Sequence, residues 1–141
     1  MSFYLDANVL VSLFAVDAHS NKVDAWIDSD PGALFVSNFA RVEFAAVVSR
    51  QVRVKAMSDT AAREALADFD DWAREMTQPI EAEARDMILA ESLVRDFATK
   101  LAAPDALHLA LASNRGYRLA TFDTRLAEAA TIRGVRAIAP G

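Results

Sequence analysis

Short apolar runs alternate with stretches of helical periodicity along this chain, and this alternation restricts the possible folds most strongly. The candidate strands are the runs at residues 3–5, 34–37, 79–81, 118–121 and 135–138, of which 79–81 is the weakest. Between them, apolar residues recur every three or four positions, most clearly from Ala62 to Met76, as expected for amphipathic helices. Strands that alternate with helices are typical of a parallel sheet covered by helices. We therefore predict an α/β fold.

The central part of the chain is predicted to contain two helices. Residues 60–76 carry an apolar stripe that begins after Ser58 and Asp59, either of which suits a helix N-cap. A second stripe runs over residues 84–97, and Pro79 lies between the two. Because 141 residues with 53% hydrophobic content are enough for one core, we expect a single domain over residues 1–141.

Residue types that are missing or scarce exclude several classes of site. The chain has no cysteine, so disulfides, thiolate zinc sites and thiol nucleophiles are ruled out, and its two histidines are His19 and His108. Oxygen ligands and hard cations therefore fit best. The start of the chain has no basic segment, and no apolar run approaches the ~20 residues of a membrane span. We expect a cytoplasmic protein with no membrane contact.

The net charge of −5 argues at first against a nucleic-acid partner, but the acids are unevenly distributed. Residues 59–96 hold 11 of the 20 acids and 4 of the 15 bases, so the rest of the chain carries a net charge of +2. The bases that could meet phosphates locally are Arg41, Arg50, Arg53 and Lys55 along one helix, and Arg115, Arg118 and Arg125 around a strand. An ordinary solvated surface explains any one of them equally well.

Four acidic residues occupy positions where an α/β fold can bring side chains together. Ligands of such sheets bind beyond the carboxyl ends of the strands, and Asp6 and Asp123 each follow a predicted strand. Glu43 lies on an apolar helical stripe, where an unpaired carboxylate costs several kcal/mol, so it needs a base, a metal or a place at the rim of the core. Asp105 lies in the first turn of a predicted helix. Helix capping is the alternative for the two aspartates after strands, and a place at the rim of the core, paired with Arg41 or another base, is the alternative for Glu43.

Together, the four carboxylates predict a divalent-metal site. Like charges within a few ångströms repel by roughly 4 kcal/mol per pair at the dielectric of a partly buried site, and a hard cation such as Mg²⁺ reverses that sign. Metal sites of this kind suggest phosphodiester chemistry. His108 lies one helical turn from Asp105, and we expect it to hydrogen-bond or orient that carboxylate rather than bind the metal. His19 is expected at the surface or at a helix start.

The motifs around these acids resemble those of a known family. They are Tyr-Leu-Asp-Ala-Asn-Val-Leu at the start, Ala-Arg-Val-Glu-Phe in the middle, and then Pro-Asp-Ala-Leu-His-Leu-Ala and Ala-Thr-Phe-Asp-Thr-Arg-Leu. In order and spacing, the chain resembles a PIN-domain ribonuclease, specifically a VapC-type toxin of a type II toxin–antitoxin system. The resemblance implies a three-layer α/β/α PIN-like fold with a central parallel five-stranded sheet. It also implies the identity of the catalytic, metal-binding acids, which are Asp6, Glu43, Asp105 and Asp123.

The resemblance further implies an endoribonuclease that depends on Mg²⁺ or Mn²⁺ and cleaves RNA phosphodiester bonds with metal-activated water. The three aspartates would bind the metal, and Glu43 would hold a ligand water or help to deprotonate it. Asn8 and Thr121 match polar positions that support the acids. Arg125 stands where some family members carry a further acid, which predicts a smaller ligand set. The expected partners are a cognate antitoxin protein that crosses the active-site groove and a second copy of the chain in a homodimer.

Other functions are compatible with the same residues. A noncatalytic RNA- or protein-binding module could retain the fold and use the acids only for structure, and metal-dependent turnover separates it from the nuclease. DNA is a further candidate substrate because the metal site itself does not read the 2′-hydroxyl. A phosphoryl-transfer enzyme with an aspartyl nucleophile is disfavoured, since it would want an acid two residues after Asp6, where Asn8 stands. The pattern fits one metal or two.

Overall fold

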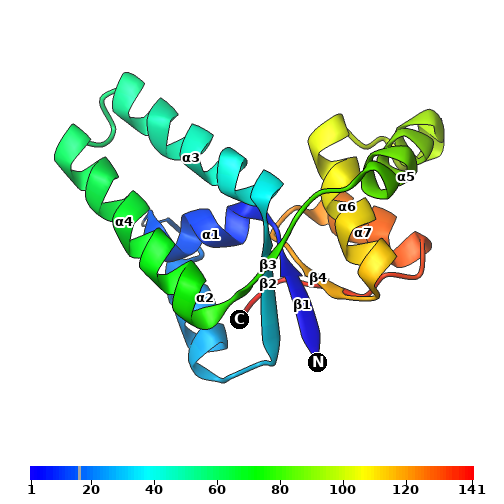
Figure 1. Ribbon diagram of the computed structural model, residues 1–141, viewed down its shortest axis with the longest axis horizontal. Helices are drawn as coiled ribbons and strands as arrows, with labels where there is room; N and C mark the ends of the chain where they lie inside the picture. The colour runs from blue at the N-terminus through cyan, green and yellow to red at the C-terminus, as the bar shows by residue number, and fades with distance from the viewer. Residues whose placement is uncertain (16) are drawn as a thin grey trace.

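A computed structural model describes residues 1–15 and 17–141 and shows an α/β fold (Figure 1). The strands within those residues are β1 (Ser2–Leu5), β2 (Ala33–Ser37), β3 (Gln78–Ile80), β4 (Arg118–Ala120) and β5 (Ala137–Ile138). The helices are α1 (Ala7–Phe14), α2 (Ser20–Asp28), α3 (Asn38–Arg53), α4 (Asp59–Met76), α5 (Ala84–Arg95), the 3₁₀ turn η1 (Phe97–Thr99), α6 (Ala103–Arg115) and α7 (Thr124–Ile132). None of these helices is long and apolar enough to cross a membrane.

The five strands form one parallel sheet in the order β3-β2-β1-β4-β5. β1 is central, with Tyr4 paired to Phe35 of β2 and to Leu119 of β4. This confirms the predicted α/β class and the five-stranded parallel sheet. All five predicted strands are present, and each of their ends lies within two residues of the predicted one. Because the strands are parallel, their carboxyl ends lie along one edge of the sheet.

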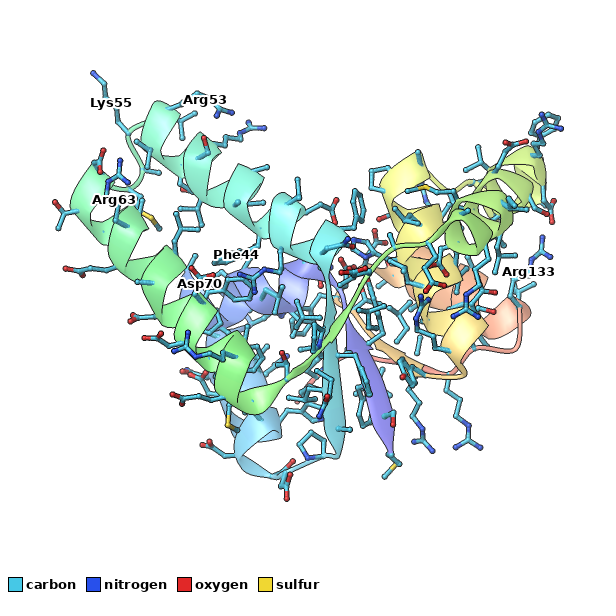
Figure 2. The ribbon with its side chains drawn as sticks, in the orientation of Figure 1. Phe44, Arg53, Lys55, Arg63, Asp70 and Arg133 are labelled. Atoms are coloured by element: carbon cyan, nitrogen blue, oxygen red, sulfur yellow. The ribbon has the colours of Figure 1, made fainter. Side chains whose placement is uncertain are left out.

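Helices cover both faces of the sheet and bury two clusters of apolar side chains. Helices α1 to α4 pack on one face, and Figure 2 shows Phe44 directed into the space between α3 and α4. Helices α5, α6 and α7 pack on the other face, on the opposite side of Figure 1. Because successive side chains of a strand point to opposite faces, β1 sends Phe3 and Leu5 into the first cluster and Tyr4 into the second.

Local sequence explains where the helices begin and end. α4 begins where the Ser58 hydroxyl accepts a hydrogen bond of 3.0 Å from the backbone of the first turn, as predicted. α5 ends at Arg95, two residues before the predicted end, because Asp96 leaves helical geometry and its side chain caps the 3₁₀ turn that follows. α6 has Pro104 in its first turn and ends at Gly116, whose φ of +68° suits glycine.

Two of the bases considered for phosphate contact are paired with acids instead. Arg41 lies 2.6 Å from Asp70 of α4. Arg115 lies 2.8 Å from the fully buried carboxylate of Asp86 and so joins α6 to α5. Arg53 lies at the far tip of the α3–α4 pair (Figure 2). The ion pairs of Arg41 and Arg115 therefore have a structural explanation that needs no nucleic acid.

Candidate metal centre

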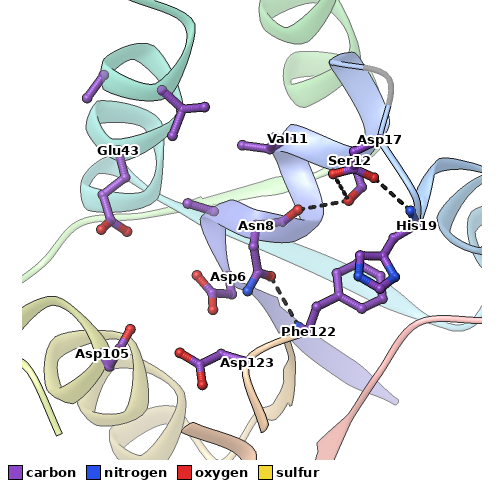
Figure 3. A pocket seen from close by; sticks show the side chains of 13 residues that line it. Asp6, Asn8, Val11, Ser12, Asp17, His19, Glu43, Asp105, Phe122 and Asp123 are labelled. Atoms are coloured by element: carbon purple, nitrogen blue, oxygen red, sulfur yellow. Dashed lines mark hydrogen bonds between the residues drawn. The ribbon is translucent and has the colours of Figure 1, made fainter. Parts of the chain in front are cut away.

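An open cleft of about 650 Å³ lies where the chain leaves the central strands. All four predicted acids line it (Figure 3). Each comes from a different place in the fold, namely Asp6 after β1, Glu43 in α3, Asp105 in the first turn of α6, and Asp123 before α7. The fold therefore brings four carboxylates that are far apart in the sequence into one cleft.

Asp6 holds the N-cap position of α1, yet its side chain does not cap that helix. Its Oδ2 accepts a hydrogen bond of 2.7 Å from the Thr121 hydroxyl, and its backbone N–H donates to the Ala120 carbonyl at 3.0 Å. The residue is 6% exposed, so this carboxylate is buried and fixed by the segment at the end of β4. The helix-capping alternative therefore does not apply to Asp6.

Asp123 combines the two roles that the sequence offered as alternatives. Its Oδ1 accepts a hydrogen bond of 3.1 Å from the Leu126 N–H and so caps α7. The same side chain lines the cleft, and Figure 3 shows it directed toward Asp6 and Asp105. One carboxylate oxygen is committed to the helix, and the other remains available to a ligand in the cleft.

Asn8 and Thr121 tie the segment after β4 to the start of α1. The Thr121 hydroxyl accepts hydrogen bonds from Asn8 Nδ2 at 3.3 Å and from the Asp123 backbone N–H at 3.0 Å. The same hydroxyl donates to Asp6, and Asn8 Oδ1 accepts a bond of 3.3 Å from the Phe122 N–H. These bonds position both aspartates that follow strands, which is what the supporting role predicted for Asn8 and Thr121 requires.

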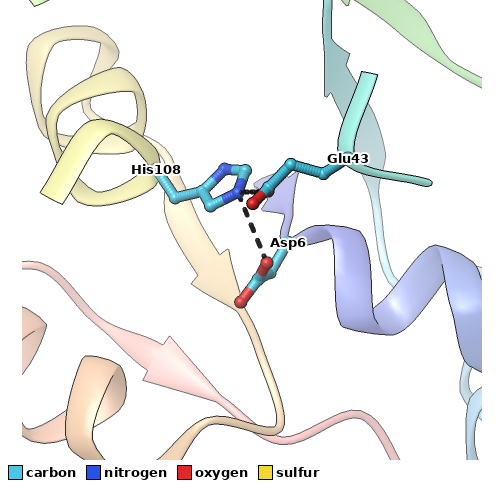
Figure 4. A group of neighbouring side chains, drawn as sticks. All are labelled: Asp6, Glu43 and His108. Carbon is cyan, nitrogen blue, oxygen red and sulfur yellow. Dashed lines mark hydrogen bonds and ion pairs between the residues drawn. The ribbon is translucent and has the colours of Figure 1, made fainter. Parts of the chain in front are cut away.

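Glu43 lies at the rim of the core, and its partner is a histidine rather than Arg41 of its own helix. Glu43 Oε1 forms a hydrogen bond with His108 Nε2, which connects α3 to α6 (Figure 4). The same ring nitrogen lies 3.5 Å from Asp6 Oδ1. The Glu43 carboxylate is therefore paired with the His108 ring, which also faces Asp6, a second acid of the cleft.

His108 is 1% exposed and is held from its other side by Tyr4. His108 Nδ1 lies 2.5 Å from the Tyr4 hydroxyl, which in turn lies 2.7 Å from Ser37 Oγ. Burial raises the pKa of Tyr4 far above its ordinary value, so the phenol keeps its proton. Because Nε2 faces carboxylate oxygens, it must carry a hydrogen and act as a donor. His108 therefore orients Glu43. The predicted hydrogen bond from His108 to Asp105 is wrong, because the two ring nitrogens bond Tyr4 and Glu43.

Asp105 shows how strongly negative charge is concentrated in the cleft. Burial, followed by the charges of Asp123 and Asp6, raises the pKa of Asp105 to about 6, although His108 acts in the opposite direction. Crowding of carboxylates is the electrostatic condition that a divalent cation relieves. The oxygen-rich donor set of this cleft therefore fits Mg²⁺ or Mn²⁺.

The most compact group of potential ligands differs in part from the predicted set. Within residues 1–15 and 17–141, Asp6, Glu43 and His108 each offer one ligand atom within 4.8 Å of the others. Asp105 and Asp123 line the same cleft but do not belong to this compact group. All four predicted acids thus line one cleft, but only Asp6 and Glu43 belong to its most compact group of potential ligands.

Several cleft residues were not predicted from the sequence. Asp17 and Phe122 line the cleft, and so does His19, which was expected at the surface or at a helix start and is the N-cap residue of α2. The rings of His19 and Phe122 are stacked. Tyr4 has the pattern of an ordinary core residue in a strand, and only its contact with His108 reveals a polar role.

Comparison with known proteins agrees with this geometry. The PIN domain family model matches residues 3–132. The fold is similar to that of VapC20 from Mycobacterium tuberculosis, a sarcin-ricin loop cleaving toxin, with a TM-score of 0.73 and 20% identity over 90% of this chain and 94% of that one. VapBC2 from Rickettsia felis, bound to a DNA fragment from its promoter, gives a TM-score of 0.75 and 14% identity over 98% of both chains.

DNA-bound VapBC from Salmonella typhimurium gives a TM-score of 0.73 and 16% identity over 98% of this chain and 97% of that one. No curated protein matches the sequence significantly. At these identities the structural likeness shows a shared fold, while the family model spans nearly the whole sequence. The chain therefore belongs to the PIN domain family, and its structural neighbours include VapC toxins of VapBC toxin–antitoxin complexes.

Proposed function

We propose that this protein is a metal-dependent endoribonuclease and the toxin of a toxin–antitoxin system. The observation that carries the proposal is the gathering of Asp6, Glu43, Asp105 and Asp123 into one cleft. Membership of the PIN domain family supports it, and so does the structural likeness to a toxin that cleaves the sarcin-ricin loop. Endonucleolytic cleavage of RNA is the reaction that this set of residues fits best.

In this proposal Asp6, Asp105 and Asp123 hold Mg²⁺ or Mn²⁺. When bound, the cation would activate a water nucleophile and offset the charge that builds up on the phosphate. Two of the three aspartates are fixed before any ligand arrives, because Thr121 donates to Asp6 and the start of α7 holds Asp123. Ligands held in advance lose little freedom on binding, which favours affinity and correct geometry.

Glu43 is proposed to accept the proton of the attacking water. His108 bonds to Oε1, so Oε2 is the oxygen left for that proton. The Glu43 side chain is 28% exposed, which lets water reach it, whereas His108 is 1% exposed. We therefore assign His108 and Tyr4 to the positioning of Glu43 and not to contact with RNA.

The test is the sequencing of new 5′ ends after bacterial total RNA is incubated with the purified protein and Mg²⁺ or Mn²⁺. We expect discrete ends that disappear with a chelator and with Asp105→Asn, which keeps the shape of the side chain but removes its charge. The matched control is Asp59→Asn, because Asp59 is an exposed residue of α4 paired with Arg63. Intact RNA with every metal, from folded protein free of antitoxin, would contradict the nuclease and favour a noncatalytic binding module.

A small antitoxin protein is the proposed partner. Its support is the likeness to the toxin–antitoxin complex from Klebsiella pneumoniae, with a TM-score of 0.64, in addition to the VapBC structures. Purification from native cells should yield the complex, and removal of the second protein should restore cleavage. We also propose that the chain forms a homodimer, which sedimentation of the isolated chain tests. Incubation with single-stranded DNA of the target sequence tests whether the substrate is RNA alone.

A further inference from the structure

One wall of the cleft carries two stacked aromatic rings that the proposed chemistry does not use. The centroids of the His19 and Phe122 rings lie 4.1 Å apart, and their planes are 9° from parallel. Both residues line the cleft that contains Asp6 and Asp123, and the two rings overlap in Figure 3. Both of these residues are partly exposed. The pair therefore presents a flat surface beside the acids.

The two rings are anchored through different parts of the fold. The Phe122 N–H donates to Asn8 Oδ1 at 3.3 Å, and the Phe122 side chain packs against the core cluster shared with α1 to α4. The backbone N–H of His19 donates to Asp17 Oδ1 at 2.8 Å. Asp17 Oδ2 in turn accepts a bond of 2.9 Å from the Ser12 hydroxyl of α1. The stack is thus positioned before any substrate arrives.

His19 supplies the outer face of this stack. The faces that the two rings turn toward each other are already in contact, and Phe122 packs against the core. Although His19 is the N-cap residue of α2, its side chain makes no capping hydrogen bond. A third flat ring that joined this stack from the cleft would lie on the outer face of the imidazole.

We propose that the His19–Phe122 pair is a nucleobase-binding subsite. An unstacked base of single-stranded RNA lies on His19, while a nearby phosphate of the same strand lies among the carboxylates. This inference rests on the proposed nuclease function and adds the class of substrate. The target nucleotide lies in a loop, bulge or end, because a paired base cannot leave its own stack to reach the ring. Stacking contacts the flat face that every base has, so the subsite selects single strands rather than a particular base.

The binding test uses RNA oligonucleotides in which 2-aminopurine, whose fluorescence falls when it stacks, replaces one base at a time around the cleavage site. Asp105→Asn protein keeps the RNA intact, and we expect quenching at one position. Adding His19→Ala should abolish the quenching and weaken binding about tenfold. His19→Tyr should preserve both, because it restores a ring. His19→Leu is the matched control, since it fills space without a flat π face and should behave like alanine.

The cleavage test uses the same His19 substitutions in an otherwise unaltered protein. His19→Leu should raise the KM for single-stranded RNA about tenfold, with kcat and Mn²⁺ affinity little changed. All variants keep the backbone bond from residue 19 to Asp17, and thermal melting verifies that each is folded. An unchanged KM, or quenching that survives His19→Leu, would overturn the subsite and leave the nuclease in place. Quenching by a protein that cuts no RNA would support the subsite and refute the nuclease, whereas no RNA binding at all would refute both.

Discussion

The Tyr4 hydroxyl connects Ser37 to His108 inside the core, and Tyr4→Phe removes this connection without changing the shape of the ring. Ser37 Oγ and His108 Nδ1 then each lose one buried hydrogen bond, although Ser37 Oγ still accepts from the Ala40 N–H, so the free energy of unfolding should fall by about 1–3 kcal/mol. His108 also loses its support, so the geometry of Glu43 loosens, and kcat should fall about tenfold with little change in KM. Urea denaturation and steady-state RNA cleavage measure the two effects.

The other tyrosine of the chain provides the control. Tyr117 stacks on Phe35, with ring centroids 4.1 Å apart, and does not line the cleft. Tyr117→Phe should therefore leave kcat unchanged. A Tyr4→Phe enzyme with full kcat would show that His108 keeps Glu43 in place without help from the tyrosine.

The raised pKa of Asp105 predicts how the stability of the metal-free protein depends on pH. Its pKa of about 6 lies above the ordinary value of 3.8, so the folded protein holds the proton more tightly than the unfolded chain. This contribution to stability is complete below pH 3.8 and is lost as pH rises through about 6. Asp105→Asn cannot ionise, so its stability relative to the wild type should increase over this window, by about 1 kcal/mol after allowance for solvent screening.

Urea unfolding in the presence of a chelator, repeated across that pH window, measures this difference. Asp59→Asn corrects for the general loss of one exposed carboxylate, because Asp59 lies outside the cleft. A stability difference between Asp105→Asn and the wild type that stays constant with pH would contradict the raised pKa.

At the scale of single residues, the acids and their polar neighbours Asn8 and Thr121 could be predicted from sequence, whereas the aromatic rings beside them could not. Asp6 and Asp123 follow apolar runs that predict strands, and Glu43 is a charged residue within an apolar helical stripe. Each acid is therefore conspicuous beside its own sequence neighbours. The stack of His19 on Phe122 joins two loops that are far apart in the chain, and neither ring departs from what its neighbours predict. Only the tertiary fold creates that contact.

Helices α5 and α6 are joined by an ion pair whose aspartate is fully buried. Asp86 accepts hydrogen bonds from Arg115 at 2.8 and 3.0 Å and from Asn114 at 2.9 Å. Burial raises the pKa of Asp86, but these bonds and one from the Glu83 backbone outweigh it and hold the pKa at about 2. Asp86→Ala would leave Arg115 without its partner, so the free energy of unfolding should fall by about 3 kcal/mol.

Chemical denaturation measures the effect of Asp86→Ala against a matched exposed pair. Asp71→Ala removes a partner of Arg74 on the surface of α4, and it should cost less than about 1 kcal/mol. Equal losses in the two variants would mean that the buried pair contributes no more than an exposed one.

At the scale of elements, periodicity located the strands and the two central helices, α4 and α5, but not every boundary. Strands of a helix-covered parallel sheet are short apolar runs, which is why they were found to within two residues. The apolar pattern of α5 continues to Phe97, but the side chain of Asp96 ends the helix, and periodicity does not register such a capping contact. β3 tolerates Pro79 because it is an edge strand.

The acidic cleft lies where the two layers of helices meet, since α1, which follows Asp6, packs on one face of the sheet and α6, which carries Asp105, packs on the other. A cation held by acids from both layers would tie them together, and a ligand that binds only the folded protein stabilises it. Mn²⁺ at about 100 times its Kd should raise the free energy of unfolding by about 3 kcal/mol. Asp6→Asn should remove most of this gain.

Thermal melting with and without Mn²⁺ measures this effect, and hydrogen exchange shows where it acts. Slower exchange should appear at the starts of both α1 and α6, beside Asp6 and Asp105, rather than in one layer. Asp59→Asn serves as the control and should be stabilised as much as the wild type, because Asp59 does not line the cleft. A melting temperature that Mn²⁺ leaves unchanged would contradict the metal centre.

At the scale of the whole molecule, the alternation of apolar runs and helical stretches predicts a parallel sheet covered by helices. No local pattern in the sequence encodes the order of the strands in that sheet. The pairing of β1 with β4 joins opposite ends of the chain. That central position of β1 has a consequence during synthesis. A nascent chain that has emerged as far as α4 exposes Asp6 and Glu43, while β4, Asp105 and Asp123 have not yet left the ribosome. The four acids therefore cannot share one cleft until β4 and the start of α7 have been synthesised and β4 has paired with β1.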